Sequence, residues 1–229
     1  MSALSTGILQ RSRARRPGPA TGAALLFSAA WVAGLLIAPA GAPLGASGRV
    51  VASFWAVHAA SASLQALFVH GIAGVALIAL SVRLRSGHGQ RSARRATAAR
   101  AAALVGLAAG VLSLLQAALE LVLGLSAPAM AAATAGDLQA AINRFDGIKM
   151  FALAGLVAGI VFALRDGQDE RLRTWTGIAL TVLLVPAALG YLLLTPAPAT
   201  IAAPALIVLL VWLPMAAMAL DRRSCPGLV

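Results

Sequence analysis

Uncharged, apolar stretches of about 20 residues recur along the chain, with short polar segments between them. A helix of that length crosses a hydrocarbon core roughly 30 Å thick. The pattern therefore predicts an all-α, polytopic transmembrane bundle of about six spans, forming one membrane domain at 21–220. The predicted spans are residues 21–39, 60–82, 101–124, 148–164, 174–194 and 200–220, and the tails are residues 1–20 and 221–229.

The basic residues are distributed unequally between the segments that join the spans. Of the 18 lysines and arginines, all but Arg49, Arg144 and Lys149 lie in the two tails or in segments 83–100 and 165–173. Cytoplasmic segments of membrane proteins are enriched in these residues. The asymmetry predicts that both termini are cytoplasmic and that the fourth span begins at the outer side.

Two span boundaries leave alternatives open. The first apolar run could be a cleaved signal peptide, but its length of about 18 residues exceeds the usual 7–15 and favours a retained anchor. Residues 50–59, with Phe54 and Trp55, either extend the second span or lie along the outer interface as an aromatic anchor, the interpretation favoured here. We expect 126–142 to lie outside, with Asp137 as N-cap of a short helix that leads into the fourth span.

Composition excludes a soluble domain, since 60% of the residues are hydrophobic, 11% are charged and the mean hydropathy is +0.89. The net charge of +11 does not indicate nucleic-acid binding, because the arginines occupy gaps between apolar runs. The basic segment 83–100 is instead predicted to be a solvated loop that contacts anionic lipid headgroups. The alanine- and arginine-rich composition is typical of a multi-pass protein of a bacterial inner membrane. Cys225 is the single cysteine, which excludes an intrachain disulfide.

Small residues follow one face of the third span, where they permit close approach of other helices. The third span is therefore predicted to pack centrally against the second and the fourth. The stripe comprises Gly106, Gly110, Ser113, Ala117 and Gly124, and the fourth span offers Ala152, Gly155 and Gly159.

Ionisable residues inside the predicted spans are the candidates for chemistry. Glu120 near the end of the third span needs a partner, and the hairpin to the fourth span predicts a contact with Lys149, or alternatively with Arg144. In a structural interpretation, Asn143 or Asp146 caps the fourth span and Lys149 pairs with Glu120. In a functional interpretation, Gln116, Glu120, Asp146 and Lys149 line an outward-facing pocket that binds a cation or exchanges a proton.

His70 lies near the middle of the second span. The expected role is a hydrogen bond to a backbone or hydroxyl group of a neighbouring helix, with a proton relay as the alternative. No motif indicates a cofactor, a metal site or a catalytic centre, so an enzyme ranks last. The sequence predicts a structural, regulatory or partner-binding membrane protein, with an ion- or proton-coupled transporter as the alternative.

Overall fold

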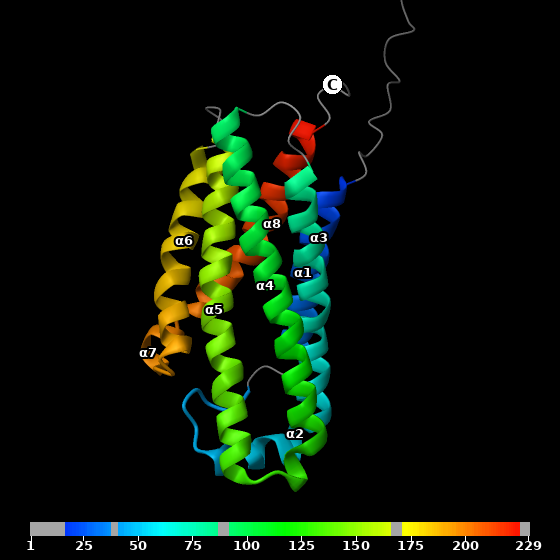
Figure 1. The fold of residues 1–229 in the computed structure, drawn as a ribbon, viewed down its shortest axis with the longest axis vertical. Coiled ribbons are helices and arrows are strands. Elements are labelled where there is room, and N and C mark those ends of the chain that lie inside the picture. Colours follow the sequence, from blue (N-terminus) through cyan, green and yellow to red (C-terminus); the bar gives the residue numbers. More distant parts are fainter. Residues whose placement is uncertain (1–16, 38–40, 87–91, 166–170, 225–229) are drawn as a thin grey trace, which may run out of the picture.

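The computed structural model describes residues 17–37, 41–86, 92–165 and 171–224, and every regular element among them is helical (Figure 1). The second apolar segment is continuous through three elements, of which the middle one, η1, is π-helical. The elements are α1 (Pro19–Ile37), α2 (Gly48–Ala66), η1 (Leu67–Ile72), α3 (Ala73–Ser86), α4 (Ala93–Ser126), η2 (Ala127–Ala129), α5 (Ala132–Leu164), α6 (Arg171–Leu192), α7 (Pro196–Ala199) and α8 (Ala202–Ser224).

Six helical stretches in the described part of the chain are long and apolar enough to cross a membrane, which confirms the predicted all-helical architecture and the predicted number of long apolar helices. They are Pro19–Ile37, Gly48–Ser86, Ala93–Ser126, Ala132–Leu164, Arg171–Leu192 and Pro196–Arg223. Residues 1–16, 87–91 and 225–229, which hold most of the predicted tails and part of the predicted basic loop, lie outside the described residues.

Three helices are longer than predicted. Residues 50–59 belong to α2, and Trp55 is buried within the protein rather than placed as an exposed interfacial anchor. Segment 126–142 is not a short capped helix: α5 already begins at Ala132, so Asp137 lies inside it and caps nothing. Arg94, Arg95 and Arg100, expected in a loop, lie in the first turns of α4.

A second hydrophobic cluster explains these extensions. Ala135 and Ile142 of α5 pack with Trp55 of α2 and Leu123 of α4, away from the main core. Burying these side chains stabilises the parts of the three helices that lie at the lower end of the bundle in Figure 1. The helices therefore continue past the residues that hydropathy alone assigns to the spans.

The long helices form a closed ring. Going around it, α1 contacts α3, α3 contacts α4, α4 contacts α5, α5 contacts α6, α6 contacts α8, and α8 returns to α1. The main hydrophobic core fills the ring, with Leu156, Leu180 and Trp212 among its most buried side chains. The described basic residues at the ends of α3, α5 and α8 and at the starts of α4 and α6 share the upper end of the bundle (Figure 1).

The predicted glycine stripe on α4 does mediate helix contacts. A Cβ atom added to Gly110 would lie 2.9 Å from the carbonyl oxygen of Gly74 on α3, and one on Gly106 would overlap the Ser81 hydroxyl. On the other side of α4, a Cβ on Gly159 of α5 would lie 2.6 Å from that of Ala102. α4 thus packs centrally between α3 and α5, as the small residues predict.

The first and last helices are joined by a capping carboxylate. Asp221 of α8 accepts hydrogen bonds from the backbone N–H of Thr21 at 2.8 Å and from its hydroxyl at 2.7 Å. The backbone N–H of Ala20 also donates to it, at 3.3 Å. An anionic oxygen at the start of a helix accepts hydrogen bonds from free N–H groups and interacts favourably with the positive end of the helix dipole. This contact therefore joins α8 to α1 and closes the ring.

Candidate functional site

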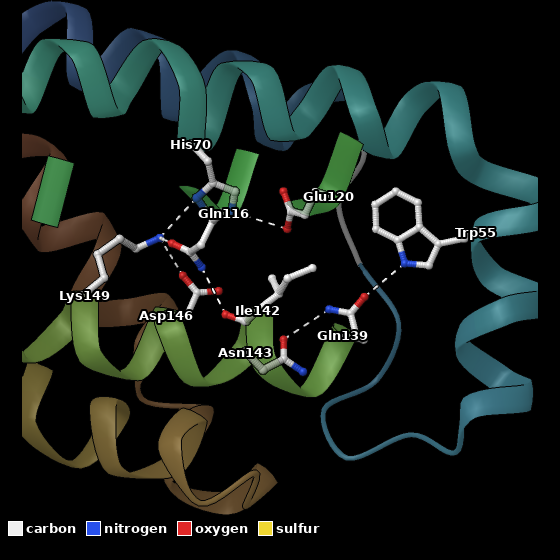
Figure 2. Close-up of polar contacts among 9 residues, drawn as sticks. All are labelled: Trp55, His70, Gln116, Glu120, Gln139, Ile142, Asn143, Asp146 and Lys149. Carbon is white, nitrogen blue, oxygen red and sulfur yellow. Dashed lines mark hydrogen bonds and ion pairs between the residues drawn. The ribbon is translucent and has the colours of Figure 1, made fainter. Parts of the chain in front are cut away.

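A connected network of polar side chains lies inside the bundle, where η1, α4 and α5 face one another (Figure 2). Its members are His70, Gln116, Glu120, Asp146 and Lys149. These are the residues that the sequence singles out, apart from Arg144, which is exposed and makes no contact with them. The bundle therefore brings residues that are up to 79 positions apart in sequence into one cluster.

Lys149 is the centre of the network and is only 3% exposed. Its ammonium nitrogen lies 2.6 Å from Oδ1 of Asp146, one turn earlier on α5. It also donates to Oε1 of Gln116 at 2.8 Å and lies 3.1 Å from Nδ1 of His70. Lysine offers three donors and no acceptor, so its whole hydrogen-bonding capacity is used inside the protein.

Glu120 does not pair directly with Lys149 as predicted. The His70 ring stands between them, with Nε2 at 3.6 Å from Oε1 of Glu120 and Nδ1 on Lys149. His70 was expected to bond a backbone or hydroxyl group, but its two ring nitrogens contact Lys149 and Glu120 instead. The result is a chain of four ionisable groups, in the order Glu120, His70, Lys149 and Asp146.

The π-helical segment Leu67–Ile72 carries His70 into this position. A π-turn widens the helix by one residue and shifts the side chains that follow it, and such turns occur frequently at functional sites. His70 is 6% exposed, whereas a helical neighbour such as Leu67 faces outward. The local backbone thus differs from an α-helix at the residue that bridges Glu120 and Lys149.

Gln116 fixes the network to the backbone of α5. The side chain is fully buried; it donates from Nε2 to the carbonyl oxygen of Ile142 at 3.2 Å and accepts from Lys149 through Oε1. Because the lysine can only donate, the orientation of the amide is determined. Gln116 thereby positions the ammonium group relative to α5.

Asn143 and Asp146 do not cap a helix, because both lie in the interior of α5. The predicted capping by Asn143 or Asp146 is therefore wrong. Instead, Lys149 lies about 25 Å along α5 from Ala132, at 1.5 Å per residue. The charged groups belong to the middle of a long helix rather than to its exposed end.

Trp31 is a site residue that the sequence analysis missed. Its ring lies edge-on to His70 at 6.3 Å between centroids, and the Lys149 ammonium lies 5.9 Å from the ring centroid. A cation over an aromatic face at this distance is favourable. The spacing of residues within α1 does not predict a contact with α5. The contact becomes apparent only from the arrangement of the helices in the structure.

A second polar chain extends the network toward the lower end. The Trp55 indole N–H donates to Oε1 of Gln139 at 3.0 Å, and Nε2 of Gln139 donates to Oδ1 of Asn143 at 3.3 Å. Gln139 was missed, although its spacing of four residues from Asn143 places both on one face of α5. This chain connects α2 to α5 outside the ionisable cluster.

Replacing Trp55 with phenylalanine should lower the free energy of unfolding by about 2 kcal/mol, because the hydrogen bond to Gln139 is lost and the smaller ring leaves part of a buried volume empty. Denaturation in detergent, followed by circular dichroism, measures the change. Trp175→Phe is the matched control, since Trp175 is 67% exposed, and it should leave stability unchanged. Equal effects of the two substitutions would contradict the burial and the hydrogen bond of Trp55.

No three His, Cys, Asp or Glu side chains converge as metal ligands within the described ranges. The cluster has a lysine at its centre, and an ammonium group repels metal ions. Its chemistry is therefore that of proton donors and acceptors.

Comparison of the chain with protein-family models, with curated proteins and with solved structures gave no significant match.

Proposed function

We propose that this protein transports protons across a membrane, and that the chain from Glu120 through His70 and Lys149 to Asp146 takes up and releases them. The observation that carries the proposal is the contact of 3.1 Å between Lys149 Nζ and Nδ1 of His70, inside a cluster with two carboxylates. Ionisable groups within membrane spans commonly mark proton or substrate pathways.

The proposal assigns the protons of the cluster from this contact. A charged Lys149 only donates, so Nδ1 of His70 accepts and the imidazole proton resides on Nε2, facing Glu120. With both carboxylates ionised, the four groups carry a net charge of −1. The cluster is therefore one proton short of neutrality.

Uptake of that proton requires rearrangement. A proton added to Nδ1 of His70 would face the Lys149 ammonium, so two donors would point at each other. Lys149 must then transfer a proton to Asp146 or move away from the ring. Proton binding and a change of side-chain contacts are thus coupled, which is the property that a proton-driven carrier needs.

The dense packing of the cluster favours a proton over a larger ion. Gln116 is fully buried and Lys149 and His70 are nearly so, which leaves little space for a hydrated cation. Glu120 and Asp146, whose side chains are 16% and 17% exposed, are the two groups through which protons enter and leave.

Location and orientation are part of the proposal. The six apolar helices suit a multi-pass protein, and the basic helix ends at the upper end of the bundle favour a cytoplasmic location for that end, in a bacterial inner membrane. Arg83, Arg85, Arg94 and Arg95 would then lie at the level of anionic lipid headgroups.

A structural or partner-binding role is the second candidate, and one observation favours it. Every fully buried nitrogen and oxygen of the five network side chains has a partner, and the contacts join η1, α4 and α5. However, apolar side chains of similar volume usually stabilise a protein at least as well as a buried ion pair. A role in fastening helices alone therefore gives little reason for four ionisable groups.

Proton uptake into sealed liposomes separates the two candidates. The purified protein is reconstituted, a potassium gradient with valinomycin sets the membrane potential, and an enclosed pH-sensitive dye reports the flux. Wild type should acidify the lumen, and His70→Gln and Glu120→Gln should each lower the rate at least about tenfold, because each removes a link of the relay.

Arg144→Gln is the matched control, because this exposed residue on α5 lies outside the network. Melting temperatures of all variants are measured in parallel, so that loss of flux is separated from loss of folding. If liposomes with the wild-type protein acidify no faster than protein-free liposomes, proton transport is refuted and the structural role remains.

A further inference from the structure

A cavity of about 320 Å³ lies at the lower end of the bundle, apart from the ionisable cluster. The first turn of α2, the segment before it, the first turns of α5 and Leu194 surround it. Its lining residues are Pro43, Gly45, Ala46, Gly48, Ala133, Gly136, Asp137, Gln139, Ala140, Asn143 and Leu194.

Two helix N-termini meet at this cavity. The first helical hydrogen bonds are from Val51 to Ser47 in α2 and from Ala135 to Ala131 in α5, each 3.0 Å long. The backbone N–H groups that precede them, at 48–50 and 132–134, have no intrahelical acceptor, and neither helix has a side-chain cap. Gly48 of α2 and Ala133 of α5 line the cavity, so both partially positive helix ends adjoin it.

Glycines allow this close approach. A Cβ atom added to Gly136 would lie 2.9 Å from Cα of Gly48, and one on Gly48 would overlap the backbone of Ala132. Any other residue at either position would separate the two helix starts. The close approach of the two helix starts thus depends on direct backbone contact at the cavity wall.

A buried side chain independently contributes a hydrogen-bond donor. An indole N–H only donates, so Trp55 fixes the Gln139 carbonyl as acceptor and its amide nitrogen as donor. Oδ1 of Asn143 must then accept from Gln139, which leaves Nδ2 of Asn143 without a protein acceptor. Asn143 is only 8% exposed and lines the cavity, and Figure 2 shows its amide nitrogen pointing away from Gln139.

We propose that this cavity binds a small oxyanion, a carboxylate or phosphate group, between Asn143 Nδ2 and the N-termini of α2 and α5. All of these groups are donors, and anions are stabilised at helix N-termini. Asp137 is exposed at the rim and opposes excess negative charge, so the site selects monoanions over dianions. The site is distinct from the proton relay and does not depend on it.

Binding is measured by calorimetry on the full chain in detergent, with sodium acetate and inorganic phosphate as probes. Wild type should bind acetate in the millimolar range, more tightly than the phosphate dianion. Asn143→Asp keeps the acceptor for Gln139 but replaces the donor with a negative oxygen, and should weaken acetate binding at least about tenfold. Asp137→Asn, at an exposed position that does not affect folding, should strengthen it about threefold.

The outcomes separate the sources of the oxyanion and can overturn the proposal. Nanodiscs that contain phosphatidylglycerol form a second arm, and retention of this lipid by wild type but not by Asn143→Asp would assign the site to a headgroup. The proposal is overturned if neither acetate, phosphate nor the lipid binds wild type. It is also overturned if both substitutions leave the affinities unchanged. None of these measurements requires proton flux, so they do not depend on the proposed transport activity.

Discussion

Replacing Lys149 with methionine should lower the free energy of unfolding by about 3 kcal/mol, because it leaves the largely buried Asp146 without its cation. The methionine fills most of the vacated volume, so the loss reports the unpaired charge rather than a cavity. Two further acceptors, Gln116 Oε1 and His70 Nδ1, also lose their donor. Denaturant titration in detergent, followed by tryptophan fluorescence, measures the change.

A double variant identifies the cause. If the unpaired carboxylate is responsible, adding Asp146→Asn to Lys149→Met should recover more than half of the lost stability. Arg144→Met removes the same charge from the exposed side of α5 and should change stability by less than about 0.5 kcal/mol. Wild-type stability of the Lys149→Met protein would contradict the buried ion pair.

Replacing Gly147 with valine should separate α5 from α6 and lower the free energy of unfolding by about 3 kcal/mol or more. A Cβ atom at this position would lie 2.7 Å from the carbonyl oxygen of Ala188 and 2.8 Å from the backbone nitrogen of Leu192. These are backbone atoms of a helix, so no rotamer change can relieve the overlap. Proteolysis and thermal unfolding of the purified variant report the loss.

Two other glycines serve as controls for Gly147. A Cβ atom on Gly22 meets nothing within 4 Å, and one on Gly155 makes an ordinary contact of 3.5 Å with Val105. Gly22→Ala and Gly155→Ala should therefore be neutral or slightly stabilising, since alanine favours helix by about 1 kcal/mol over glycine. Destabilisation as large as that expected of Gly147→Val would show that helix glycines matter here for a reason other than close packing.

Hydropathy was sufficient to predict the number of long apolar helices, because each span must contain its own apolar residues. It was insufficient for their ends. The lower part of α5 is rich in small residues with modest hydropathy, and it is helical because Ala135 and Ile142 pack on α2 and α4. Tertiary burial of this kind is not visible in a local window, so Asp137 was misassigned as a cap.

The sequence predicted most residues of the candidate site but not the contacts between them. Spacing along α4 and α5 identified Gln116, Glu120, Asp146 and Lys149, since a hairpin brings neighbouring helices together. It could not show that His70 lies between Glu120 and Lys149, because that depends on the rotation of a third helix and on the π-helical turn within it. Trp31 depends on ring closure, which is set by contacts between the first and last helices.

The capping of α1 by Asp221 has a consequence for synthesis of the protein. α1 is synthesised before α8, so it acquires one of its two lateral neighbours only when α8 arrives. Until then, Phe27 and the small residues beside it face lipid or a chaperone instead of α8. Chains that lack α8 should therefore remain open bundles, which quality-control proteases can attack. Completion of α8 is the step that closes the ring of helices.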